Sequence, residues 1–156
     1  PFPHIRWRLH LGDFGQALKT QVFPAPHAIF YDPYSPSRNV EMWTLEQFLL
    51  LKNTLHSETP FLLSNYTCST AVRVTLLLAG FFVGQGSSIG LKLETTLASN
   101  CLELLENPLP RSWLRRVQAS SNSAPLRAGA YTKLPISPDD LKRLESLPQF
   151  TPLTLS

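Results

Sequence analysis

Asp32 and Tyr34 are the residues whose types and spacing best suit chemistry, and they directly follow an apolar run at residues 28–31. The run has the composition of a buried strand, and nearby prolines prevent it from continuing as a strand or a helix. In an open α/β sheet, ligands bind in the crevice outside the carboxyl ends of the strands. The stretch 27–44 therefore predicts a strand followed by a catalytic loop. The alternative is that Asp32 only forms a turn and Tyr34 is an ordinary surface ring.

Asp13 is a second candidate, because it follows an alternating segment, residues 5–11, that has the period of a strand. A carboxylate at a strand end can hydrogen-bond a ligand. It can equally cap the helix predicted for residues 14–20 by accepting a main-chain N–H. On the residue alone, capping is the favoured interpretation.

The elements that position these residues alternate along the chain. Strands are predicted at residues 5–11, 28–31 and 61–66, helices at 14–20, 44–56 and 70–79, and a strand pair at 81–83 and 91–98. Such alternation implies right-handed crossovers and a mainly parallel sheet. The last pair has a connection too short for a crossover and must be antiparallel. This is the C-terminal half of an α/β, Rossmann-like methyltransferase sheet.

Local signals support several of these boundaries. Thr44 with Gln47 three residues later forms a capping box for the helix at 44–56, and Gly80 closes the helix at 70–79. The glycine-rich stretch 84–90 resembles a phosphate cradle, but a strand-like segment follows it where a dinucleotide site needs a helix. It is therefore predicted to be the hairpin connection. Ser137 and the proline after it start a last helix within the C-terminal part.

Composition narrows the class of protein. The chain has 156 residues, of which 43% are hydrophobic, and a net charge of +3, which allows an anionic partner without requiring one. No apolar run reaches the ~20 residues of a membrane span, and no signal peptide is visible. Two cysteines are too few for a disulfide framework or a zinc site. The sequence predicts a cytoplasmic protein with no metal and no membrane partner.

Four segments carry a resemblance to a known family. GDFGQAL, HAIFYDPYSPSRNVEMWT, FLLSNYTCSTAVRVTLLLAGFFV and GLKLETTLAS occur in this order and together resemble the MnmC-type family across residues 5–99. The stretch Asn39 to Thr44 is the most specific part. These enzymes are tRNA methyltransferases that act on the wobble uridine. The resemblance implies that S-adenosylmethionine donates a methyl group to the amine of 5-aminomethyl-2-thiouridine.

The resemblance also implies residue roles. Asp32 matches the catalytic-loop aspartate, Tyr34 stands where the family usually has Phe, and Asp13 matches the acidic position that approaches the cofactor's adenine. The catalytic residues are then Asp32 and Tyr34. The predicted cofactor-binding residues are Asp13, Phe14, Asp32 and Pro33, and the predicted substrate-binding residues are Tyr34, Pro36, Tyr66, Lys92 and Glu94.

This sequence departs from the family pattern in places. Val40 replaces a proline, and Leu91 and Leu93 stand where the family tends to carry basic residues. Fewer basic residues would weaken contacts to tRNA phosphates. The glycine loop and the ribose-binding acidic residue of the cofactor site are absent from residues 1–156.

We therefore expect residues 1–99 to be the C-terminal half of a methyltransferase domain whose cofactor-loop part precedes residue 1. Residues 100–156 form a helical extension on it, and the isolated chain is inactive. An FAD-dependent oxidoreductase domain is one possible partner, and a stand-alone enzyme is the alternative. Two other functions stay open: an adenine-N6 methyltransferase, since Asp32-Pro33-Tyr34 is similar to the Asp-Pro-Pro-Tyr loop, and a non-catalytic binding remnant.

Overall fold

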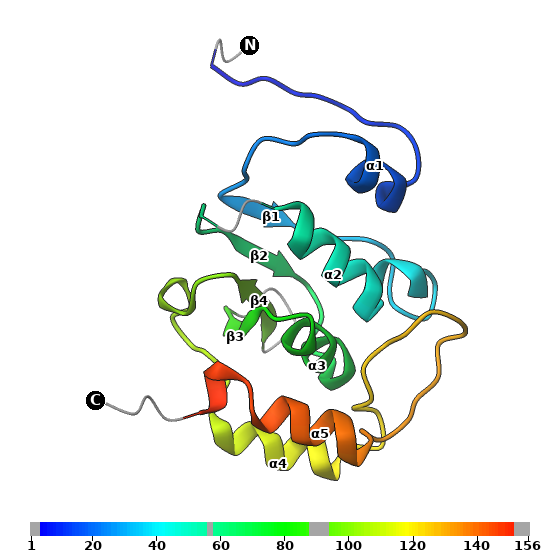
Figure 1. Cartoon of the computed structure of the whole chain (residues 1–156), viewed down its shortest axis with the longest axis vertical. Helices are drawn as coiled ribbons and strands as arrows, with labels where there is room; N and C mark the ends of the chain where they lie inside the picture. The colour runs from blue at the N-terminus through cyan, green and yellow to red at the C-terminus, as the bar shows by residue number, and fades with distance from the viewer. Residues whose placement is uncertain (1–3, 56–57, 88–93, 152–156) are drawn as a thin grey trace.

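The computed structural model describes residues 4–55, 58–87 and 94–151, which form an open sheet with helices packed against it (Figure 1). The described strands are β1 (Ala28–Phe30), β2 (Leu62–Asn65), β3 (Phe82–Gly86) and β4 (Thr95–Ser99). Their order is β1-β2-β4-β3, with β1 parallel to β2 and the β2–β4 and β3–β4 pairs antiparallel. The predicted α/β fold with a closing antiparallel hairpin is confirmed. The described sheet is mixed rather than mainly parallel.

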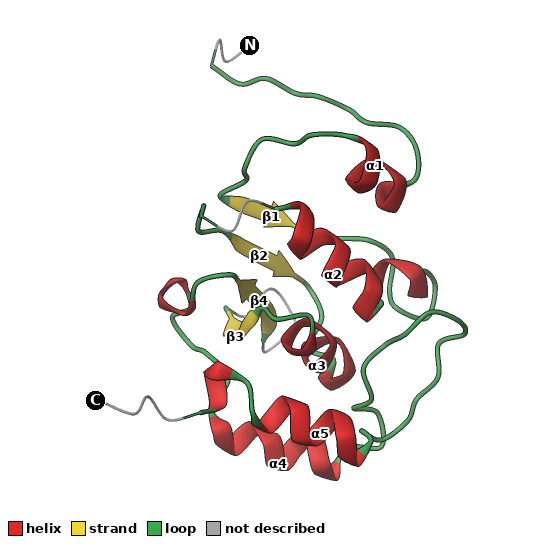
Figure 2. Cartoon of the chain, viewed as in Figure 1, coloured by secondary structure: helices red, strands yellow, loops and turns green. Residues whose placement is uncertain are grey.

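Helices alternate with these strands and continue beyond them (Figure 2). They are α1 (Phe14–Thr20), α2 (Leu45–Thr54), α3 (Thr70–Leu78), α4 (Leu114–Ala119) and α5 (Pro138–Glu145), with short 3-10 helices η1 (Val40–Trp43), η2 (Leu102–Leu104), η3 (Arg111–Trp113) and η4 (Pro148–Phe150). The predicted caps of α1, α2 and α5 are confirmed, because Asp13, Thr44 and Ser137 each accept a main-chain N–H three residues on. Each bond satisfies one of the unpaired donors at a helix start.

Gly80 ends α3 as predicted. Its φ of 87° lies in the left-handed region, which a residue without a Cβ adopts at little cost. The turn brings the amide of Phe81 within 3.1 Å of the carbonyl of Leu76 and directs the chain into β3. The glycine-rich stretch begins inside the hairpin rather than in its connection, since Gly84 and Gly86 belong to β3 and pair with β4. The rest of the predicted connection, residues 88–90, lies outside the described residues.

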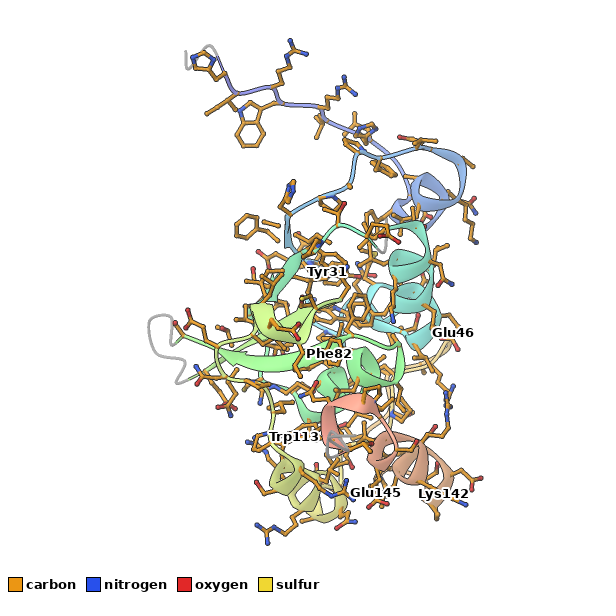
Figure 3. All side chains as sticks on the ribbon, turned by 60° about the vertical axis from the view of Figure 1, so that its left-hand side comes forward. Tyr31, Glu46, Phe82, Trp113, Lys142 and Glu145 are labelled. Atoms are coloured by element: carbon orange, nitrogen blue, oxygen red, sulfur yellow. The ribbon has the colours of Figure 1, made fainter. Side chains whose placement is uncertain are left out.

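One hydrophobic cluster holds the molecule together. Aromatic rings form its centre, where Trp43 meets Tyr31 edge to face at 5.5 Å and Phe48 at 6.4 Å. Figure 3 shows Tyr31 in the crowded middle of the molecule. Buried side chains from the C-terminal part, including Val117 and Leu144, belong to the same cluster. The division at residue 99 stays a prediction.

The predicted strand at residues 5–11 is wrong. The structure places this segment outside the described sheet, with Trp7 91% exposed and Leu9 and Leu11 also exposed. Figures 1 and 3 show it running clear of the sheet, and the ring of His10 next to it meets the ring of Phe23 at 5.6 Å. Alternation predicts a two-faced segment, but a strand also needs a partner to hydrogen-bond. Nothing in the described part of the chain lies beside it as one.

The two edges of the sheet are finished differently. At the β3 edge, the chain returns so that Leu109 N donates to Val83 O at 2.9 Å and Gln85 N donates to Asn107 O at 2.8 Å. At the other edge, β1 pairs only with β2 among the described strands, and Phe30 is 86% exposed.

Candidate active-site loop after β1

The loop that follows β1 opens onto a pocket of about 480 Å³. Its lining residues are Asp32, Pro33, Tyr34, Ser35, Asn39 and Tyr66. Asp32 is exposed, and the Tyr34 side chain is 79% exposed. The structure therefore brings together the predicted catalytic residues and the predicted substrate residue Tyr66, which comes from the end of the neighbouring strand β2.

Parallel pairing explains why these two strand ends meet. The carboxyl ends of parallel strands lie at the same edge of a sheet, and Tyr31 N donates to Ser64 O at 2.9 Å just beyond the β1–β2 ladder. Asp32 and Tyr66 thus leave the sheet side by side. A crevice outside strand carboxyl ends is where ligands bind in open α/β sheets.

The loop is held by hydrogen bonds to its main chain. The Tyr66 hydroxyl donates to Pro33 O at 3.1 Å, and the Trp43 indole Nε1 donates to Tyr34 O at 2.7 Å. A turn follows directly, in which Ser35 O accepts the amides of the residues three and four positions on, at 2.8 and 3.0 Å. The main chain of the loop is therefore fixed while its functional side chains remain accessible.

The electrostatics at this end of the sheet favour a neutral phenol. Burial, and the nearby carboxylate of Asp32, raise the pKa of Tyr66 above its usual value of 10.0. The phenolate would be both desolvated and repelled, so the hydroxyl keeps its proton at neutral pH and remains a donor.

Two of the residues predicted to bind the cofactor, Asp13 and Phe14, lie in a different pocket. Asp13 and Phe14 line a cavity of about 380 Å³ formed by residues 10–14, 16, 17, 20, 21 and 23. Asp13 Oδ1 accepts the amide of Gln16 at 2.7 Å, so the capping role is confirmed. Phe14 packs edge to face on Tyr31 at 6.4 Å, which links this cavity to the residue just before the candidate catalytic loop.

The residues present fit one part of an S-adenosylmethionine site. Asp13 is exposed at the cavity and uses Oδ1 in the cap, so its other carboxylate oxygen can accept a hydrogen bond from an exocyclic amine. Phe14 supplies a ring beside it. Nearby, the side-chain Nε2 of Gln47 is buried and has no hydrogen-bond partner among the described residues. Its Oε1 lies 3.2 Å from the ideal Cβ position of Gly15, close to Asp13.

Glu94, which was predicted to bind substrate, does not line the loop pocket. The Glu94 carboxylate lies 3.2 Å from Nη1 of Arg73 and 3.7 Å from Nη1 of Arg116. Arg73 is fully buried, so desolvation lowers the pKa of its guanidinium while Glu94 opposes that shift. Pro36 is half-buried outside the pocket lining. Lys92 lies outside the described residues.

Sequence reasoning missed the partners that fix the loop. Trp43 was noted only as part of the stretch Asn39 to Thr44, and no local pattern tells which carbonyl a buried indole will reach. Arg73 was missed because its partner lies 21 residues away, across the hairpin. Within the described ranges, no group of three or more His, Cys, Asp or Glu residues can hold a metal ion, and no helix is long and apolar enough to cross a membrane.

The comparisons with known proteins define the class. Residues 3–101 match a family described as S-adenosyl-L-methionine-dependent methyltransferase, and the chain belongs to that family. S-adenosylmethionine is the methyl donor of such enzymes. The MnmC-type resemblance is also confirmed by the relatives that follow.

Several proteins similar to this chain are called tRNA 5-methylaminomethyl-2-thiouridine biosynthesis bifunctional protein MnmC. The one from Leptospira interrogans is 34% identical over 113 residues, or 72% of this chain and 17% of its own length. The one from Leptospira borgpetersenii is 34% identical over 121 residues, covering 75% and 18%. A solved structure titled MNMC2 from Aquifex aeolicus aligns with a TM-score of 0.62 at 30% identity. The alignment covers 88% of this chain and 45% of that one. The chain thus spans less than a fifth of these bifunctional relatives.

Proposed function

We propose that this chain forms part of an enzyme that transfers a methyl group to the amine of 5-aminomethyl-2-thiouridine at the wobble position of tRNA. The observation that carries the proposal is the loop at the end of β1. There Asp32 and Tyr34 share one pocket with Tyr66 from the neighbouring strand, on a main chain held in place. The family match and the names of the relatives support the choice of reaction and substrate.

Asp32 suits the requirements of methyl transfer to an amine. An alkylamine with a pKa near ~10, by analogy with lysine, is mostly protonated at neutral pH and must lose a proton before it can act as a nucleophile. An exposed carboxylate at the pocket can hold the ammonium, orient it and take its proton. Positioning is the larger contribution, since near-attack geometry can supply several kcal/mol, at most about 7–11.

Tyr34 suits the recognition of the base. Its exposed ring offers a flat surface on which an unstacked base can stack, a contact worth about 1–3 kcal/mol. Pro36 adds an apolar surface in the same loop, and we assign RNA contact to Glu94 at the start of the β4 arm and, from the sequence, to Lys92. The pairing of Glu94 with two arginines makes its role there an indirect one.

For the cofactor, Asp13 and Phe14 would hold the adenine while Asp32 and Pro33 approach the reacting end. S-adenosylmethionine, when bound, supplies the activated methyl group. We assign the remaining cofactor contacts to protein that pairs with the edge of β1 that no described strand covers, and therefore expect no activity from residues 1–156 alone. The proposed partner is tRNA, and the relatives named as bifunctional proteins support a second enzymatic domain, for which we propose an FAD-dependent oxidoreductase, with a stand-alone enzyme as the alternative. The expected location is the cytoplasm.

The test is Asp32→Asn in the full natural chain that contains this sequence. The amide keeps the size of the side chain but cannot hold an ammonium or take its proton, so kcat should fall by about 100-fold or more. Binding of S-adenosylmethionine should change little. Single-turnover methylation of hypomodified tRNA and calorimetry measure the two quantities.

Asp139→Asn is the matched control, because Asp139 is exposed on α5, far along the chain from the loop. Near wild-type turnover by the Asp32 variant would contradict the proposal. Methylation of unmodified DNA in place of tRNA would instead indicate an adenine-N6 enzyme, and no cofactor binding by the full chain would indicate a binding remnant.

A further inference from the structure

The catalytic side chains of the loop have no anchors of their own. Within the described residues, neither the carboxylate of Asp32 nor the ring of Tyr34 makes a hydrogen bond or a ring contact, and both are exposed at the pocket. Their positions therefore depend on the main chain that carries them. A misplacement of about 1 Å in such groups can cost ~100-fold in rate.

That main chain is fixed at two successive carbonyls. Pro33 O accepts the hydroxyl of Tyr66 at 3.1 Å, and Tyr34 O accepts the indole N–H of Trp43 at 2.7 Å. A peptide unit is planar, so a hydrogen bond that fixes its carbonyl also fixes the Cα atoms on both sides. The first bond orients the peptide between Pro33 and Tyr34, and the second orients the peptide that follows Tyr34. Together they define where the Tyr34 side chain leaves the backbone.

The two donors are themselves rigid. Trp43 is fully buried, and its ring meets Tyr31 at 5.5 Å and Tyr66 at 6.2 Å, both edge to face with interplanar angles of 89°. Tyr66 follows β2, which is paired on both sides. The donors thus belong to the packed core while the acceptors belong to the exposed loop. This arrangement transmits the rigidity of the core to the loop.

We propose that Trp43 and Tyr66 are positioning residues, which fix the Asp32 carboxylate and the Tyr34 ring through the carbonyls of Pro33 and Tyr34. The inference rests on the proposed function and refines it, because it gives Tyr66 a role that acts through the loop rather than on the substrate. Neither donor loses its proton near neutral pH, since an indole N–H does not titrate and the pKa of Tyr66 is raised. The loop is held in the same way across the working pH range.

The first test is Tyr66→Phe in the full natural chain, with Tyr131→Phe as the matched control. Both changes remove one phenol hydroxyl, and Tyr131 belongs to the C-terminal part, where its hydroxyl accepts a 3.4 Å hydrogen bond from Asn122. For Tyr66→Phe we expect kcat to fall about 10-fold, part of the ~100-fold that a full 1 Å misplacement costs. The KM for tRNA should rise together with the fall in kcat, because the misplaced Tyr34 ring stacks less well on the base, whereas the Kd for S-adenosylmethionine should stay within about 2-fold. The control should leave all three unchanged.

The second test needs no turnover. Amide hydrogen exchange at residues 34–39 should accelerate about 10-fold in Tyr66→Phe, while exchange in the β2–β4 ladder stays as in the wild type. Trp43→Phe, which removes the other donor, should accelerate exchange over the same residues. If these residues only stabilise the fold, their replacement would instead lower the melting temperature and accelerate hydrogen exchange in the core.

The outcomes are separable. Unchanged exchange at residues 34–39 overturns the anchoring, and accelerated exchange with an unchanged kcat overturns the positioning role. A rise in KM with an unchanged kcat would assign Tyr66 to substrate binding and also overturn the inference. If the wild type methylates no tRNA, the proposed function fails, and the exchange measurement still decides whether Tyr66 holds the loop.

Discussion

The two edges of the sheet are built in opposite ways. The β3 edge is covered by residues 107–109, and the side chain of Gln149 then pairs with the main chain of Val83 like one more strand residue. Val83 N donates to Gln149 Oε1 at 2.8 Å, and Gln149 Nε2 donates to Val83 O at 2.7 Å. The β1 edge has no such cover among the described residues, and its end residue Phe30 is exposed.

The comparison shows which edge of the sheet the described residues cover and which they do not. An uncovered strand edge presents unpaired N–H and C=O groups that can pair with another strand. Most of the exposed large apolar side chains among the described residues belong to the N-terminal 30 residues, which include β1: Ile5, Trp7, Leu9, Leu11, Val22 and Phe30. The β3 side is stabilised by its own chain, whereas the β1 side offers both apolar surface and a pairing edge next to the candidate catalytic loop.

The largest loss of stability is expected when Arg73, on the covered side of the sheet, is replaced. Its buried guanidinium bonds Thr96 Oγ1, Thr95 O and the Glu94 carboxylate. Arg73→Met should lower the free energy of unfolding by about 2–4 kcal/mol, somewhat below the ~3–5 kcal/mol for a fully buried pair, because Glu94 retains some contact with water.

Arg116→Met is the control for that change, since Arg116 meets the same carboxylate from an exposed position. It should cost at most about 1 kcal/mol. Urea unfolding of the chain measures both variants. Equal losses would show that the buried network does not stabilise this side.

A smaller effect is expected at Gln149. Gln149→Ala leaves the buried main-chain N–H of Val83 without its partner and removes the donor to Leu109 O, at a cost of about 1–3 kcal/mol. Gln21→Ala makes the same change at an exposed position near the β1 side. That control should stay within about 0.5 kcal/mol. A loss at Gln21 as large as that at Gln149, by thermal or urea unfolding, would contradict the comparison.

The smallest effect on stability is expected at Phe30. Phe30→Ser should alter the free energy of unfolding by less than about 0.5 kcal/mol, because the ring is already in water. It should nevertheless reduce self-association of the isolated chain, since apolar uncovered edges promote pairing between chains. Sedimentation at several concentrations measures this. Unchanged self-association would show that the β1 edge does not pair with other copies of the chain.

The parts of the fold that sequence could predict are those set by neighbouring residues. Asp13, Thr44 and Ser137 cap helices through bonds to residues three positions away, and Gly80 ends a helix by its own φ. The alternation of residues 5–11 is equally local, but strand formation depends on a partner, so that prediction failed.

The candidate site shows the same limit. The type and order of Asp32, Pro33 and Tyr34 indicated a loop at a strand end, and the structure places Tyr66 beside them. The bond from Trp43 to Tyr34 O depends on how η1 packs beneath the loop. The pairing of Glu94 with Arg73 depends on a helix and a hairpin meeting. Neither contact can be predicted from the spacing of residues along the chain.

The contact between Val83 and Gln149 also sets an order of events during synthesis. These residues are 66 positions apart, so the β3 edge is made long before the side chain that covers it. At ~5–20 residues per second, a ribosome needs about 3–13 s to add that interval. Residues 107–109 are made earlier in that interval and cover part of the β3 edge, but Val83 lacks its two bonds to Gln149 until the interval ends. A ribosome stalled before position 149 should therefore carry a chain more readily bound by chaperones than one stalled after it.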